Sequence, residues 1–294
     1  MRSPRPHPAR SRTPATAARD GGAVAPTFAG LLKAWRSARR YSQLELASET
    51  EVSQRHLSFM ESGRANPSRD MVLHLSQVLR VPLRERNDML LAAGYAPLYP
   101  ERALNDASMA GIRRALETTL RHHEPFPGLV VDRQWNVLMH NAAVDRLIGL
   151  LGPPARVWKR VDPSGSRNLM RLTLHPKGLR PLVVDWRPTA AALLARLPAE
   201  LQANPASAGL RALLAELHAL PGMPTPAEAD AAPPMQVPVL SLKLRRGDAT
   251  LELFSMVCTF GTALDLTADE LRLELLFPGD DTTAQFLRSA EQRA

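Results

Sequence analysis

The first hundred residues repeat one pattern, in which a capping residue opens a short run of apolar positions at helical spacing. Ser42 and Glu45 form an S-x-x-E capping box, and Ser53 and Ser68 are further N-caps. Gly94 closes the last run. The pattern predicts five short helices around one apolar core. They cover 28–40, three segments that start after these caps, and 83–93, and together they form an all-α domain over residues 26–96.

The pattern changes beyond residue 96. Residues 97–106 contain two prolines and no period, which is typical of a linker. Runs with a period of two then alternate with helical runs. In chain order we expect a helix over 108–122, a hairpin of strands 128–132 and 135–140, a helix over 141–150 capped by Asn141, helices over 182–202 and 206–219, a mobile loop over 220–238, and strands over 239–245, 249–260 and 271–277. This order predicts a mixed α+β domain of the PAS type over 107–288.

The strand over 249–260 is apolar on both faces. One face carries Phe254, Met256, Cys258 and Phe260, and the other carries Leu251, Leu253 and Val257. A strand of this kind is covered on both sides. We expect helices on one side and a ligand, a second subunit or a further helix on the other. In the last strand, Arg272 and Glu274 point away from the apolar face.

The helix that starts after Ser53 has a polar outer face suited to reading DNA. Gln54 can bond adenine, Arg55 can fork onto guanine, and the ring of Phe59 can touch a thymine methyl group. Arg64 in the following loop is placed to meet a phosphate, and we expect the same of Gln43. Alternatively, Phe59 packs on a neighbouring helix, or the whole bundle binds protein. The candidate DNA-binding residues are Gln43, Ser53, Gln54, Arg55, Ser58, Phe59 and Arg64.

Charge supports this interpretation. The chain of 294 residues has a formal net charge of +8, and residues 1–99 hold 15 Lys and Arg against 8 Asp and Glu, while the remainder holds 22 against 21. Excess positive charge beside the predicted reading helix favours phosphate binding. Residues 1–25 are rich in Pro, Ala and Arg, and we expect a disordered basic tail.

Cellular location follows from what the sequence omits. Cys258 is the only cysteine, so no disulfide forms within the chain, which fits a reducing compartment. No apolar run approaches the ~20 residues of a membrane span, and residues 1–25 lack the apolar stretch of a secretory signal. We expect a cytoplasmic, nucleoid-associated protein with no membrane partner.

The segment from Gln43 to Pro67 resembles the Xre-type helix-turn-helix domains of phage repressors. The matching positions are Gln43, Leu46, Ala47, Val52, Ser53, Leu57, Ser58, Glu61, Gly63 and Pro67. Glu51 departs from the pattern, because the family has glycine at this turn, where the backbone favours positive φ. A non-glycine residue there costs about 1 kcal/mol. The resemblance implies a lambda-repressor-like fold that binds double-stranded DNA.

A longer resemblance covers about Phe28 to Leu287. It is carried by the runs V-P-L-R-E-R-N-D-M-L-L-A-A-G-Y-A-P-L-Y-P-E at 81–101, E-P-F-P-x-L-V-V-D-R-x-W-N at 124–136, N-L-M-R-L-T-L-H-P-x-G-L at 168–179 and F-S-M-V-C-T-F-G-T-A-L-D at 254–265. These runs resemble the MmyB-like transcription regulators. The resemblance implies a PAS-like second domain whose pocket takes a fatty acid.

No catalytic motif, metal-binding spacing or phosphate-binding loop is present in the sequence, so we expect neither an enzyme nor a metal or cofactor. Apolar walls for an acyl chain are available, although core packing explains the same residues. The candidates are Leu129, Val131, Met139, Phe254 and Met256, with Arg171 or Arg180 for a carboxylate. We expect a homodimer that places two reading helices one DNA turn, ~34 Å, apart. The rival interpretations are a C-terminal domain that only dimerises, or a small-molecule enzyme fused to a DNA-binding domain.

Overall fold

The N-terminal domain is a bundle of five helices. A computed structural model describes residues 26–203, 207–225, 228 and 241–292, so the predicted tail over 1–25 lies outside it. The helices are α1 (Phe28–Ala38), α2 (Gln43–Glu49), α3 (Gln54–Glu61), α4 (Arg69–Val78) and α5 (Leu83–Ala92). Their core includes Leu32, Leu46, Leu57, Met60 and Leu75, all fully buried. The predicted all-α domain is confirmed.

Local signals place the ends of these helices. The Ser42 hydroxyl accepts from the backbone of Glu45, whose carboxylate accepts from the backbone of Ser42, so the predicted capping box is present. Glu51 lies in the turn between α2 and α3 with φ of 53°, the conformation for which the family uses glycine. Gly94 has φ of 87° just past α5. Helix α1 stops at Ala38, two residues before the predicted end.

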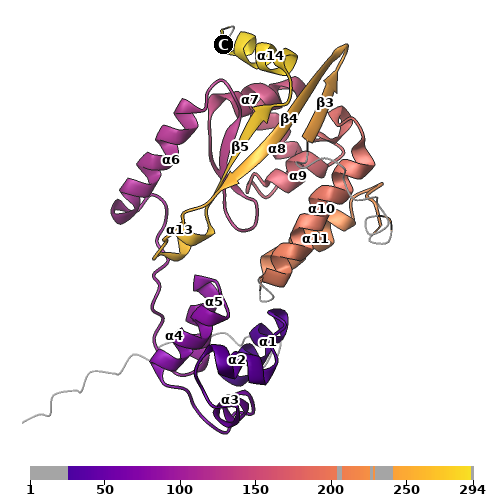
Figure 1. Cartoon of the computed structure of the whole chain (residues 1–294). Helices are drawn as coiled ribbons and strands as arrows, with labels where there is room; N and C mark the ends of the chain where they lie inside the picture. Colours follow the sequence, from indigo (N-terminus) through magenta and orange to yellow (C-terminus); the bar gives the residue numbers. More distant parts are fainter. Residues whose placement is uncertain (1–25, 204–206, 226–227, 229–240, 293–294) are drawn as a thin grey trace, which may run out of the picture.

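The C-terminal domain is an antiparallel sheet with helices on both faces (Figure 1). Its strands are β1 (Gly128–Val131), β2 (Val137–His140), β3 (Ser241–Arg246), β4 (Ala249–Cys258) and β5 (Arg272–Pro278), in the order β2-β1-β5-β4-β3. Its helices are η1 (Ala107–Met109), α6 (Ala110–His122), α7 (Ala142–Ile148), η2 (Gly149–Leu151), α8 (Pro154–Val161), α9 (Leu169–Leu174), η3 (Arg180–Leu182), α10 (Trp186–Ala203), α11 (Ala208–His218), α13 (Leu266–Glu270) and α14 (Asp281–Gln292). The predicted α+β class is confirmed, and so is the predicted hairpin, which β1 and β2 form.

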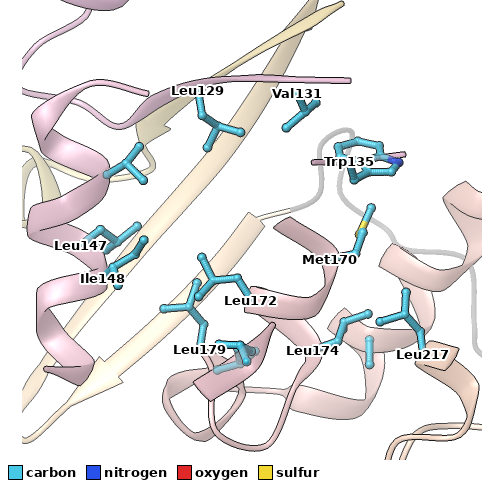
Figure 2. Packing of buried hydrophobic residues seen from close by; sticks show 14 of the residues in the cluster. Leu129, Val131, Trp135, Leu147, Ile148, Met170, Leu172, Leu174, Leu179 and Leu217 are labelled. Atoms are coloured by element: carbon cyan, nitrogen blue, oxygen red, sulfur yellow. The ribbon is translucent and has the colours of Figure 1, made fainter. Parts of the chain in front are cut away.

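The main core lies between the sheet and helices α7 to α11. Figure 2 shows Leu129 and Val131 pointing from β1 into this core, with Leu147 of α7 and Leu172 of α9 among their neighbours. Helix α6 covers part of the opposite face, where Leu116 and other buried side chains form a smaller cluster. Helices α8, α9, α13 and α14 are additions to the predicted elements. Residues 226–227 and 229–238 of the predicted loop over 220–238 lie outside the described residues, as do residues 239–240 at the start of the predicted strand.

The outer face of β4 carries Met256, which is 53% exposed within the single chain, so cover of this face by a ligand or a second subunit stays a prediction. The structure corrects two expectations about side chains. Glu274 does point away from the α6 side, but it is 7% exposed and faces the main core. Asn141 precedes α7 without capping it, because its side chain bonds the backbones of Gly128, Leu120 and Phe126 instead.

The segment predicted as a linker is hydrogen-bonded to both domains. The Asn87 side chain accepts from the backbone N–H groups of Leu98 and Tyr99 at 2.9 and 3.0 Å and donates to the Tyr99 carbonyl. The Pro100 carbonyl accepts from Leu266, at the start of α13, at 2.9 Å. Helix α13 lies next to α5 (Figure 1), so the connection is braced by both domains.

Candidate DNA-binding surface and ligand pocket

Helix α3 separates a buried face from a polar one. Leu57 and Met60 are fully buried, and the Ser53 hydroxyl caps the helix by accepting from the backbone of His56 at 3.2 Å. On the other face, Gln54 and Arg55 are exposed, while Ser58 and Phe59 are half-buried. The Arg55 guanidinium lies over the Phe59 ring, 5.3 Å from its centroid. The predicted reading residues therefore share one solvent-facing side of the helix.

Of the two predicted phosphate contacts, one side chain is exposed to solvent and the other is hydrogen-bonded within the domain. Arg64 is exposed in the loop after α3. Gln43 instead donates to Glu61 at 2.7 Å, and the same carboxylate accepts from Arg36 at 2.6 Å. Burial raises the pKa of Glu61, but these hydrogen bonds outweigh it and leave the pKa below its usual range. The Gln43 side chain thus ties the start of α2 to the end of α3 and fixes the angle between the two helices.

An apolar cavity of about 90 Å³ lies inside the C-terminal core. Its walls come from the sheet, from α7 and α9, and from α10, with Leu129, Trp135, Ile148, Leu172, Leu193 and Leu253 among them. One end is polar and carries Arg196, Ser255 and Glu274. An apolar hollow with a few convergent polar groups is the usual form of a small-molecule site, although such sites commonly measure about 300–1,000 Å³.

The polar end is held by a hydrogen-bonded cluster. The Trp135 indole donates to Glu200 at 3.1 Å, and Arg272 donates to the other oxygen of Glu200 at 2.7 Å. The Arg196 guanidinium lies over the Trp135 ring, 4.6 Å from its centroid. Burial raises the pKa of Glu274 above its usual range despite opposing effects of Arg196, Ser255 and Arg272.

Only one predicted ligand residue lines this cavity. This residue is Leu129. Val131 is buried in the same core but does not line the cavity. Met139 packs on the opposite face, near α6. Phe254 and Met256 also face away from the cavity, since side chains alternate along β4 and Leu253 and Ser255 take the inner positions.

Neither predicted carboxylate partner reaches the cavity. Arg171 is paired with Asp162 at 2.9 Å and with Glu216 at 2.6 Å. Arg180 lies over the Trp186 ring, 4.3 Å from its centroid, and donates to the Pro221 carbonyl. The arginine that lines the cavity is Arg196, which the sequence did not distinguish because it sits in a long alanine-leucine helix.

A second polar cluster joins the two domains. Arg133, in the turn between β1 and β2, donates to Glu85 of α5 and, at 3.0 Å, to Glu270 of α13. Arg84 of α5 pairs with Glu270 at 2.7 Å and with Glu101 of the connection. Burial raises the pKa of Glu85, while Arg133 lowers it. A cleft of about 590 Å³ opens beside the cluster. Arg133 is two residues from Trp135, which lines the ligand cavity.

Residues 26–203, 207–225, 228 and 241–292 contain no group of His, Cys, Asp and Glu side chains that could hold a metal ion. None of their helices combines the length and the apolar character needed to cross a membrane.

A helix with an exposed reading face and a second domain with an apolar pocket together define a DNA-binding transcription regulator with a ligand-binding domain. Comparison with protein families gives the same result. Residues 32–86 match the helix-turn-helix model, and residues 112–290 match the MmyB-like transcription regulator ligand binding domain. The chain belongs to the MmyB-like transcription regulators.

Individual proteins add little to this assignment. No curated protein matches the chain. Among solved structures, it is similar to one described as "Structure of an RNA-binding Light-Oxygen-Voltage Receptor", at 14% identity and a TM-score of 0.23. The alignment covers 90% of this chain and 62% of that one.

Proposed function

We propose that the protein binds double-stranded DNA as a homodimer and changes its DNA affinity when an apolar ligand, such as a fatty acid, occupies the C-terminal cavity. The observation that carries this proposal is that a single turn of the chain reaches from the cavity to the DNA-binding domain. Trp135 lines the cavity, and Arg133 of the same turn contacts α5 of the DNA-binding domain. Trp135 also has φ of 66°, a conformation that a non-glycine residue holds only when its surroundings enforce it.

Ligand action needs two arrangements of this turn with different affinity for the ligand. The cavity of about 90 Å³ is smaller than the usual range for small-molecule sites, so an acyl chain enters only if lining side chains move outward. Trp135 is the lining residue nearest in sequence to the domain junction. Its displacement would shift Arg133 and loosen the contacts with Glu85 and Glu270.

A second copy of the chain is the partner that the exposed face of β4 fits. Met256 is 53% exposed there, next to Phe254, whose ring stacks on Phe277 at 5.6 Å between centroids. An apolar strip of this kind is suited to a symmetric contact. Two copies would offer two α3 helices to a roughly palindromic site. Met256→Lys should shift the sedimentation coefficient from dimer to monomer; a dimer that persists would place the contact elsewhere.

Selection of bound sites from random DNA tests the DNA-binding proposal. We expect an enriched motif with two half-sites, and the spacing between them reports the dimer geometry. The proposal fails if the purified chain ignores duplexes of every composition at low ionic strength.

Native mass spectrometry and thermal melting with C12–C18 acids test the ligand. We expect a co-purifying lipid or a rise in melting temperature. Leu193→Trp, which fills the cavity, should abolish the rise, whereas Leu91→Trp, on the exposed side of α5, should retain it. With neither lipid nor shift, the C-terminal domain acts only in dimerisation. Steady conversion of an added acid to product would instead favour the enzyme interpretation.

A further inference from the structure

The polar end of the cavity holds a buried carboxylate, Glu274, one of whose oxygens accepts no hydrogen bond from the described residues, with the guanidinium of Arg196 facing it. Glu274 is 7% exposed, and its Oε2 atom has no hydrogen-bond partner among the residues that the structure describes. Arg196 faces the Trp135 ring and, within the same described residues, makes no ion pair. A buried acceptor without a partner has lost its hydrogen bonds to water and gained none in return, which destabilises the unliganded protein. A ligand that supplies the partner therefore gains affinity.

The polar groups around Glu274 already hydrogen-bond one another. Both oxygens of Glu200 accept hydrogen bonds, from Trp135 and from Arg272. Ser255 stands beside Glu274 on the neighbouring strand and lowers its pKa. The groups that face Glu274 are thus Arg196 and Glu200 from α10, Arg272 from its own strand and Ser255 from β4.

We propose that Arg196, Ser255 and Glu274 form a head-group subsite for a ligand with an apolar tail and one carboxyl group, which shares a single proton with Glu274. This inference rests on the proposed function, because it concerns the same cavity. Two carboxylates within hydrogen-bond reach cannot both stay ionised. With one proton between them the pair carries a single negative charge, which Arg196 balances. The shared hydrogen bond occupies the Oε2 atom that has no partner in the unliganded protein.

Burial makes the protonated form of Glu274 accessible, because it raises the pKa of this carboxyl above its usual range. Above the pKa of Glu274 in the free protein, binding of an ionised acid must take up one proton. Affinity for the acid then falls about tenfold for each further pH unit. Below that pKa the affinity for the ionised acid is independent of pH. An alcohol with the same tail brings no charge and has no such dependence on a shared proton.

Isothermal titration of the full chain with dodecanoic acid and with 1-dodecanol tests the subsite. Titrations between pH 6 and 9, in two buffers with different ionisation enthalpies, report the protons taken up. We expect the acid to bind at least tenfold more tightly than the alcohol at the low end of this range. We also expect proton uptake to approach one per bound acid as the pH rises.

Variants separate the three partners. Arg196→Met should weaken binding of the acid at least tenfold and binding of the alcohol less than threefold. Glu274→Gln keeps a hydrogen-bond donor but cannot ionise, so it should bind the acid with little dependence on pH. The matched control is Arg187→Met, an exposed arginine on the same helix that does not line the cavity, and it should leave both affinities unchanged.

The outcomes distinguish the subsite from the cavity. Equal affinity for acid and alcohol at every pH, without proton uptake, overturns the subsite and leaves the apolar cavity intact. The same holds if Arg196→Met binds the acid like the parent chain. Failure of both ligands to bind overturns the proposed ligand response together with the subsite. Proton uptake is measured on the unaltered chain, so it decides the question even if a variant fails to fold.

Discussion

Replacing Arg133 with alanine removes the group that connects the ligand-binding domain to α5. The Arg133 side chain is 9% exposed, and that of its partner Glu85 is 5% exposed. Removing one member of a buried pair commonly costs about 3–5 kcal/mol, because the other charge stays buried. The neighbouring cleft admits water and Glu270 retains Arg84, so we expect the lower end of this range, about 3 kcal/mol, at pH 8.

The loss should depend on pH with a definite sign. Burial already raises the pKa of Glu85 above its unfolded value, and the variant raises it further because the lowering effect of Arg133 is gone. Below the unfolded pKa, Glu85 is protonated in both states and destabilises the folded variant little. Above the folded pKa, Glu85 is a buried unpaired carboxylate, and the variant loses the full amount of stability. Each unit of added shift corresponds to about 1.4 kcal/mol above the folded pKa, so we expect a smaller loss at pH 5 than at pH 8.

A double-mutant cycle measures this effect. Urea unfolding of Arg133→Ala, Glu85→Gln and the double variant, at pH 5 and pH 8, gives the coupling between the two side chains. The double variant should be more stable than Arg133→Ala at pH 8, because it leaves no charge at position 85. Arg187→Ala, which breaks an exposed ion pair, should lose less than about 1 kcal/mol and serves as the control. Equal losses at both pH values, or no rescue in the double variant, would refute the reasoning.

Three further outcomes follow from single residues. Arg55→Ala should cost roughly 1–3 kcal/mol of DNA-binding free energy at one base pair, and equal losses on all duplexes in a filter-binding assay would make Arg55 a phosphate contact. Glu51→Gly should raise the free energy of unfolding by up to about 1 kcal/mol, since φ is 53° at this turn; a lower melting temperature would contradict this. Asp162 is buried, but hydrogen bonds from Ser164, Ser166 and Arg171 lower its pKa to about 2. Asp162→Asn should therefore destabilise the protein by up to about 2 kcal/mol above pH 4, and the difference should shrink as the pH falls toward 2 in acid unfolding.

The N-terminal domain was predictable because its determinants are local. Capping residues such as Ser53 act on a backbone group three positions away, and the apolar spacing of Leu57 and Met60 lies within one helix. Even the departure at Glu51 could be interpreted from the turn alone, and the positive φ confirms that interpretation. The α+β class was predictable as well, because hairpins such as that of β1 and β2 are short-range features.

The ligand cavity was harder to predict, since alternation along a strand does not say which face is inner. Strand β4 is apolar on both faces, so Phe254 and Met256 were as plausible as Leu253. The choice depends on α10, which packs from far along the chain and brings Arg196 toward Glu274. The domain junction depends on distant partners as well, because Arg133 and Glu270 are 137 positions apart in sequence.

The anchored connection between the domains affects how operators are chosen. Asn87 hydrogen-bonds the backbone at Leu98 and Tyr99, and the Pro100 carbonyl accepts from Leu266. The DNA-binding domain is therefore attached to the C-terminal domain by a fixed connection and not by a flexible linker. In a two-fold dimer, the contact between the two C-terminal domains would then set the distance between the two DNA-binding domains. Such a dimer would select operators by the spacing between half-sites as strictly as by their base sequence. It would not bind sites in which that spacing is lengthened by half a helical turn.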